Sequence, residues 1–143
     1  MNEQPVRSVE TDVLRIAYVE HGPADGWPVI LSHGFPYDVH AFDEVAPILA
    51  RAGARIIAPY ARGFGPTRFV SDALMRNGQQ AARGRDIIQL AGALGLERPI
   101  LGGFDWGGQC VLCGGRAMAR ADWWTRILRR LRRDRRWSTT APG

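Results

Sequence analysis

The chain has 143 residues, of which 45% are hydrophobic and 23% are charged. This length suits one domain with its own hydrophobic core, because domain sizes cluster near about 100–150 residues. The sequence has no run of about 18 apolar residues, which excludes a membrane-spanning helix. Residues 1–5 lack the basic and apolar regions of a signal peptide, so we expect a cytoplasmic protein.

Charge is unevenly distributed along the chain. All nineteen basic residues are arginines. Residues 1–115 carry ten arginines and twelve acids, a net charge of −2, whereas residues 116–143 carry nine arginines and two acids, a net charge of +7. The overall charge of +5 therefore describes the carboxyl-terminal tail and says little about the surface of the rest.

Six elements are expected in chain order after a loose terminus at residues 1–8. Strand formers, short apolar runs and helical spacing of apolar residues predict strands at 13–19, 29–32, 54–58 and 99–104, and helices at 40–52 and about 80–94. Pro47 is a blemish within the first helix. Glycines 53 and 95 are expected to end the two helices.

Strands and helices alternate, and this alternation is typical of βαβ units with a parallel sheet. In open parallel sheets, sites lie beyond the carboxyl ends of the strands. The loops after residues 32, 58 and 104 all leave carboxyl ends. We therefore expect these three loops to meet at one edge of the sheet.

The third of these loops has the outline of a nucleophile elbow. An apolar run leads to Asp105, and the small residues Gly103, Gly107 and Gly108 surround it. Such a turn holds one reactive residue in a strained conformation, and its neighbours must be small so that strand and helix can approach each other. An aspartate also suits an ordinary turn or a helix N-cap, but the flanking glycines favour the elbow.

Three motifs stand at these loops: HGFP at 33–36, RGFG at 62–65 and GFDWGG at 103–108. Together they resemble the amino-terminal half of an α/β-hydrolase, in the branch with an aspartate nucleophile that includes epoxide hydrolases and haloalkane dehalogenases. The resemblance runs from about residue 8 to residue 108. It implies an α/β fold with a mostly parallel sheet, flanking helices and a nucleophile elbow.

The resemblance also implies a chemistry. Asp105 would attack an electrophilic carbon of an epoxide or alkyl halide and form an alkyl-enzyme ester. Backbone N–H groups of Phe35 and Trp106 would form the oxyanion hole, and the Trp106 indole would face the leaving group. The motif residues in supporting positions are His33, Gly34, Pro36, Gly103, Gly107 and Gly108. Two alternatives without a catalytic role stay open. His33 could be a loop histidine held by the backbone, and Phe35 and Trp106 could be core aromatics.

The rest of the family's catalytic triad has no counterpart in this sequence. Family members place an acid and then a histidine after the nucleophile. Here the only acids after Asp105 are Asp122 and Asp134, and no histidine follows His40. We therefore expect a truncated hydrolase core at residues 1–109, capable of a single alkylation without steady turnover.

The tail at residues 110–143 differs in composition from the resembled family, whose elbow helix continues with small and apolar residues. Read one base later from the codon of Gly115, the same message can spell AALWPERTGG, and relatives often carry a similar segment after the elbow helix. Met118 followed by Ala119 forces the tryptophan of that string. We therefore expect an out-of-frame tail that is disordered or an irregular helix.

The tail and its two cysteines allow other interpretations. Clustered arginines suit a nucleic-acid-binding arm, and helical spacing of apolar residues at 124–131 suits a membrane-surface helix; we expect neither partner. A non-catalytic binding protein, using the elbow pocket or the basic tail, is the alternative function. Cys110 and Cys113 lack the further ligands of a zinc site and the context of a redox pair, so we expect reduced thiols, no metal and no cofactor.

Overall fold

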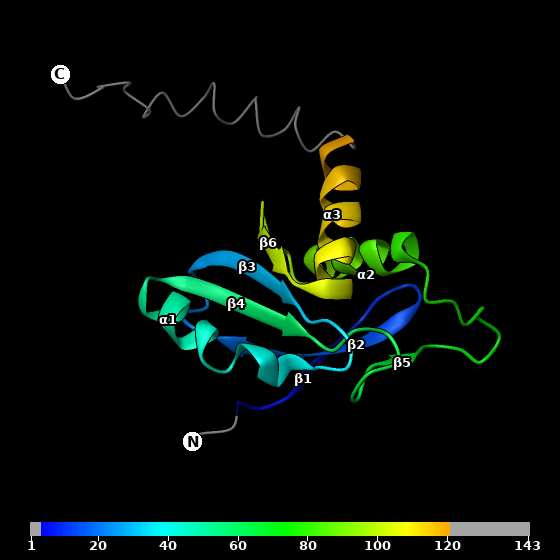
Figure 1. Cartoon of the computed structure of the whole chain (residues 1–143), viewed down its shortest axis with the longest axis horizontal. Helices are drawn as coiled ribbons and strands as arrows, with labels where there is room; N and C mark the ends of the chain where they lie inside the picture. The colour runs from blue at the N-terminus through cyan, green and yellow to red at the C-terminus, as the bar shows by residue number, and fades with distance from the viewer. Residues whose placement is uncertain (1–3, 121–143) are drawn as a thin grey trace.

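The computed structural model describes residues 4–120, which form three layers. In chain order the elements are β1 (Arg7–Glu10), β2 (Leu14–His21), β3 (Trp27–Ser32), the 3₁₀ helix η1 (Val39–Phe42), α1 (Val45–Arg51), β4 (Ala54–Pro59), β5 (Arg68–Phe69), α2 (Gln80–Ala93), β6 (Ile100–Gly103) and α3 (Asp105–Arg120). Helix α1 covers one face of the sheet, and α2 and α3 lie together on the other (Figure 1). None of the helices described is long and apolar enough to cross a membrane.

The sheet has the strand order β1-β2-β4-β3-β6, with β5 paired to β2. Strand β3 runs parallel to both β4 and β6, whereas β2 is antiparallel to β1, β4 and β5. The sheet is therefore mixed, with a parallel centre. The predicted site loops follow the three parallel strands, so their carboxyl ends share one edge as expected.

Buried side chains alternate along the central strands and build a core on each face. Val29 and Leu31 pack in the cluster beneath α1, while Ile30, which is fully buried, packs with residues of α2. This is the period of two that a strand imposes when both of its faces are covered. The two cores fix β3 between the helical layers, and β3 carries the first of the site loops.

The predicted elements are confirmed with two corrections. The helix expected at 40–52 is wrong as one element, because η1 and α1 divide it. Pro47 is the third residue of α1, where its missing N–H leaves no bond unmade. The loose terminus at 1–8 is also wrong in its last two residues, because Arg7 starts strand β1 and pairs with Tyr18 of β2.

Helix α3 continues the fold beyond the elbow. Its side chains at Cys110 and Met118 are 2% and 7% exposed. The crossing with α2 is very close, since a Cβ on Gly84 would lie 2.8 Å from the Cβ of Cys113 and 2.9 Å from the nitrogen of Gly114. The expected division after residue 109 thus falls inside α3. Residues 121–143 lie outside the described part, so the two-part division and the tail stay predictions.

Candidate active site

Asp105 stands at the turn between β6 and α3. Its φ angle is +51°, in the left-handed region that costs most residues energy and that aspartate enters more readily than bulky residues. The turn follows directly on β6, and the Asp105 side chain is exposed at the carboxyl edge of the sheet. The backbone therefore has the strained strand-to-helix geometry of a nucleophile elbow.

Two glycines permit the close approach of strand and helix at this turn. A Cβ on Gly103 would lie 2.7 Å from the carbonyl oxygen of Ser32, and a Cβ on Gly107 would meet the same oxygen still more closely. At Gly108 a Cβ would lie 3.4 Å from the Gly103 oxygen, an ordinary contact. The steric requirement for small residues thus rests on Gly103 and Gly107.

The carboxylate of Asp105 is held by backbone donors. The Phe35 N–H donates to Asp105 Oδ1 over 3.0 Å. Hydrogen bonds from the backbone N–H groups of Trp106 and then of Phe35 are the main causes that lower the pKa of Asp105 below its ordinary value. Gly34 makes room for this approach, because a Cβ there would lie 2.6 Å from the Cβ of Asp105. The structure thus brings together the three residues expected to form the nucleophile and its oxyanion hole.

His33 is fully buried and joins two of the site loops. Its Nδ1 lies 3.0 Å from the carbonyl oxygen of Gly34, and its Nε2 accepts the Ala61 N–H over 3.0 Å. Burial is the main cause that lowers the pKa of His33, which favours the neutral ring with its proton on Nδ1. Both ring nitrogens are therefore engaged with the backbone, as expected for a loop histidine with a structural role.

Aromatic side chains surround the elbow on its exposed side. Phe35 and Trp106 are 60% and 47% exposed, so neither is a core residue. Their ring centroids are 5.8 Å apart, and Phe35 also contacts Phe64 at 6.4 Å. Pro36 follows Phe35 through a cis peptide bond. These rings give Asp105 an apolar surrounding that suits a small organic substrate.

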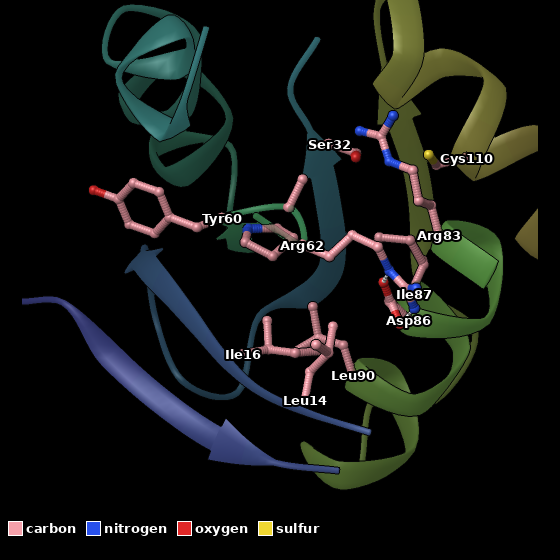
Figure 2. A pocket seen from close by; sticks show the side chains of 12 residues that line it. Leu14, Ile16, Ser32, Tyr60, Arg62, Arg83, Asp86, Ile87, Leu90 and Cys110 are labelled. Carbon is pink, nitrogen blue, oxygen red and sulfur yellow. Dashed lines mark hydrogen bonds and ion pairs between the residues drawn. The ribbon is translucent and has the colours of Figure 1, made fainter. Parts of the chain in front are cut away.

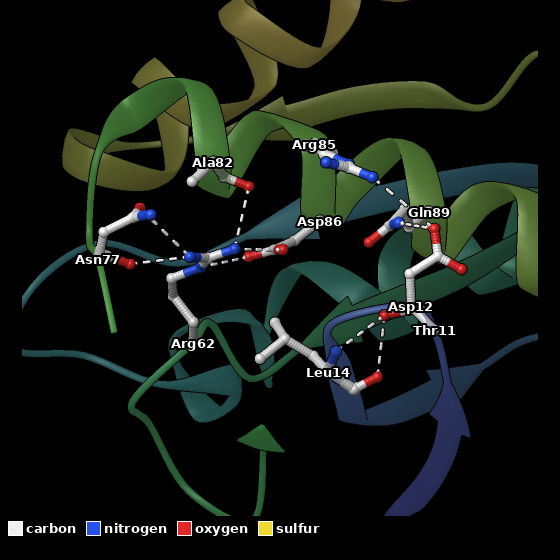
Figure 3. A network of polar contacts seen from close by, with 9 residues as sticks. All are labelled: Thr11, Asp12, Leu14, Arg62, Asn77, Ala82, Arg85, Asp86 and Gln89. Carbon is white, nitrogen blue, oxygen red and sulfur yellow. Dashed lines mark hydrogen bonds and ion pairs between the residues drawn. The ribbon is translucent and has the colours of Figure 1, made fainter. Parts of the chain in front are cut away.

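A buried ion pair holds the loop after β4. Arg62 binds both carboxylate oxygens of Asp86 on α2 through Nε and Nη2, each over 2.7 Å; Nη1 donates to the carbonyl oxygen of Asn77, and Nη2 also donates to that of Ala82 (Figure 3). We call this cluster the Arg62 staple. Burial is the main cause that raises the pKa of Asp86, while the Arg62 guanidinium opposes it. The staple fixes the second site loop to helix α2.

Two site residues could not be inferred from the motifs. Asp86 and Arg83 both lie on α2 and are 8% and 6% exposed. The Arg83 guanidinium lies over the Trp106 ring, with its Cζ 5.0 Å from the ring centroid. Their three-residue spacing places them on one face of the helix, and this spacing could have indicated that they act together. Without the fold, a helix face with charged residues is interpreted as exposed to solvent.

A hollow lies beneath the elbow, between the sheet and helices α2 and α3. It has about 350 Å³ of empty space, its open mouth included, and its lining includes Ser32, Arg83, Asp86 and Cys110 (Figure 2). Asp105 does not line it. The Asp105 carboxylate therefore lies outside this hollow, at the exposed edge of the sheet.

The histidines of the sequence lie elsewhere or are already engaged. His21 ends β2, which is antiparallel to β4, so it lies toward the amino-terminal edge of the parallel strands. His40 contacts Asp43 over 3.1 Å in η1. Within residues 4–120, no histidine has a contact with Asp105 that would make it a general base.

Comparison with known proteins agrees with this geometry. A family model described as the alpha/beta hydrolase fold matches residues 28–136. The chain belongs to the α/β-hydrolase family. It is 32% identical over 105 residues to epoxide hydrolase A of Mycobacterium tuberculosis, covering 73% of this chain and 32% of that protein. It is 38% identical over 76 residues to a haloalkane dehalogenase of Mycobacterium marinum, covering 50% and 26%.

Solved structures of the α/β-hydrolase family also match. A candidate epoxide hydrolase from Klebsiella pneumoniae is 47% identical, with a TM-score of 0.72, and the match covers 74% of this chain and 35% of that one. The relatives of this α/β-hydrolase chain are thus epoxide hydrolases and haloalkane dehalogenases. It spans about a third of the length of the relatives it matches.

Proposed function

We propose that this chain carries the nucleophilic half of an epoxide-hydrolase- or dehalogenase-type site, with Asp105 as the nucleophile. The observation that supports it most directly is the Asp105 carboxylate itself. It stands at a left-handed turn and accepts the Phe35 N–H over 3.0 Å. A carboxylate oriented by backbone donors on a rigid turn is prepared for attack on carbon.

In the proposed step, Asp105 Oδ2 attacks the electrophilic carbon and forms a C–O ester bond. The carbon–halogen bond breaks and its electron pair leaves with the halide; with an epoxide, a ring C–O bond breaks and the alkoxide takes a proton from water. Oδ1 becomes the ester carbonyl oxygen and keeps the Phe35 N–H, while the Trp106 indole N–H faces the leaving group. Hydrolysis of the ester would need a base that activates water.

The proposed substrates are small epoxides or alkyl halides, and the proposed extent of reaction is one ester per chain. The exposed rings of Phe35 and Trp106 support an apolar substrate. Both ring nitrogens of His33 are engaged with Gly34 and Ala61, so His33 has no free nitrogen to activate water. We therefore expect the ester to accumulate.

Intact-protein mass spectrometry tests this proposal directly. After incubation with styrene oxide, the wild type is expected to gain the mass of one epoxide molecule. After incubation with 1-bromobutane it is expected to gain one butyl group, because bromide leaves. D105N is expected to gain neither at residue 105. Fragment-ion sequencing locates the adduct, and hydroxylamine removes it if it is an ester but not if it is a thioether on Cys110 or Cys113. No adduct on Asp105, or continuous product release, would contradict the proposal. A binding protein would instead keep its ligand affinity in D105N.

A further inference from the structure

Arg83 is a buried cation that forms no ion pair within residues 4–120. It lies in the first part of α2, only 6% exposed, and no hydrogen bond or ion pair joins its guanidinium to another of these residues. Both oxygens of Asp86, one turn further along the helix, bind Arg62 instead. A buried charge without a partner is energetically costly, so packing alone does not explain why an arginine stands here.

Among the described residues, the Arg83 guanidinium lies against the ring of Trp106. Its Cζ lies 5.0 Å from the ring centroid, inside the range of a cation–π interaction. Figure 2 shows the Arg83 side chain leaving α2 and reaching toward Ser32 and Cys110, beneath the elbow. The Phe35 ring is the second neighbour of Trp106, at 5.8 Å. The indole next to the nucleophile is thus held by contacts from two separate elements.

The chemistry of this contact extends to the Trp106 indole N–H. A cation over an aromatic face draws electron density from the ring, which makes the ring N–H a stronger hydrogen-bond donor. Arg83 also adds a positive charge near Asp105, where it contributes a minor part of the lowered pKa. Negative charge that develops on a leaving group at this point would therefore be better stabilised.

We propose that Arg83 is a positioning residue that acts through Trp106, holding the indole at the elbow and strengthening its N–H as a donor to the leaving group. This proposal rests on the proposed function of Asp105. While the C–O ester bond forms and the carbon–halogen bond breaks, the indole N–H donates a hydrogen bond to the departing halide and transfers no proton. Arg83 itself touches no reacting atom.

The first test compares rates of ester formation with 1-chlorobutane and 1-iodobutane. R83M keeps most of the side-chain length but removes the charge, R83K keeps a cation, and R85M is the control. Arg85 lies on the same helix, with its side chain 64% exposed and 3.7 Å from Asp12. We expect R83M to slow the chloride reaction by about tenfold, R83K to recover most of that loss, and R85M to stay within about twofold. A smaller effect is expected with iodide, which needs less stabilisation.

A double-mutant cycle separates an effect through Trp106 from a general packing effect. W106F removes the indole N–H but keeps the backbone N–H of the oxyanion hole. R83M is expected to change the rate of the W106F chain by less than about twofold. If R83M slows W106F as much as it slows the wild type, or slows neither, the proposal is overturned.

A spectroscopic test does not depend on the reaction. The Trp106 indole ¹H–¹⁵N signal is assigned as the one that W106F removes. R83M should move it upfield, because the N–H becomes a weaker donor, and R83K should return it toward the wild-type position. If no ester forms but this pattern holds, the proposed function fails while Arg83 still positions the indole. If esters form on Asp105 but R83M leaves the indole signal unmoved, the proposed function stands and the role of Arg83 is overturned.

Discussion

Two buried arginines lie at the same part of helix α2 but differ in their partners: Arg62 reaches it from the loop after β4, and Arg83 belongs to it. The Arg62 side chain is 7% exposed, and its nitrogens bind the Asp86 carboxylate and two carbonyl oxygens. Arg83 is 6% exposed and has the Trp106 ring as its partner. The ion pair and hydrogen bonds of Arg62 fix the backbone segments that they join. The Arg83 guanidinium contacts a ring and forms no such bonds within residues 4–120. Arg62 thus fixes the loop after β4 to helix α2, whereas Arg83 contacts the indole beside Asp105, through which we propose that it acts.

Breaking the Arg62 staple should have the largest effect on stability. R62M leaves the Asp86 carboxylate buried without its partner, so we expect the free energy of unfolding to fall by about 3–5 kcal/mol. R83M breaks no ion pair; it loses the contact with the Trp106 ring but also removes a buried unpaired charge, so the free energy of unfolding should change by less than about 1–2 kcal/mol. Equilibrium denaturation with urea measures both losses. Equal losses in the two variants would contradict the contrast between the two arginines.

Matched variants sharpen this prediction for the Arg62 staple. R76M removes an exposed arginine whose pair with Asp72 is open to solvent, and we expect it to cost at most about 1 kcal/mol. The double variant R62M/D86L removes both charges and should recover much of the R62M loss, because no carboxylate is then left buried alone. A double variant as unstable as R62M would show that lost packing, and not the orphaned charge, causes the loss.

The crossing of α2 and α3 should give the next largest effect. G84A would place a Cβ 2.8 Å from the Cβ of Cys113, so we expect a loss of about 1–3 kcal/mol. G92A is the control on the same helix, since a Cβ there would meet nothing within 4 Å. G92A should gain about 0.5–1 kcal/mol, because alanine favours the helix. Thermal unfolding that shows both substitutions to be neutral would contradict this close helix contact.

The smallest expected effects are in the titration of two carboxyl groups. Asp86 should titrate above the ordinary value of 3.8, mainly because of burial, and Asp105 below it, mainly because of the Trp106 and Phe35 N–H groups. Asp105 then adds stability that is present above pH 3.8 and lost as the pH falls through its folded pKa. For Asp86 the sign is reversed, and its contribution is lost as the pH rises through its folded pKa. Carboxyl ¹³C signals followed by NMR check both directions, and a shared midpoint would contradict them.

Much of this arrangement could be predicted from the sequence, because local and global patterns agree. Apolar runs ending at the three site motifs predicted strands whose loops meet, and the structure confirms this through the bond from Phe35 to Asp105 and the bond from Ala61 to His33. The glycines around residue 105 predicted a turn at which strand and helix approach each other closely, and Gly103 and Gly107 lie at that approach. Each of these signals depends on residues close together in the sequence.

The parts that could not be predicted depend on contacts between distant residues. Strand β1 has a polar sequence, and its pairing with β2 decides its conformation. Arg62 and Asp86 of the Arg62 staple are separated by 24 residues, so only the fold shows that they meet. The same holds for Arg83 and Trp106, because a lone arginine in a helix carries no sign of which ring it will cover.

The protonation state of His33 limits the pH range in which the loops after β3 and β4 stay joined to each other. The ring bridges Gly34 and Ala61 only while Nε2 carries no proton, because a second ring N–H would point at the Ala61 N–H. Its pKa is lowered from 6.5, mainly by burial, so the neutral ring adds stability above pH 6.5 that is lost as the pH falls toward the folded pKa. Acid that protonates His33 would therefore break the hydrogen bond from the Ala61 N–H and separate the loop after β3 from the loop after β4.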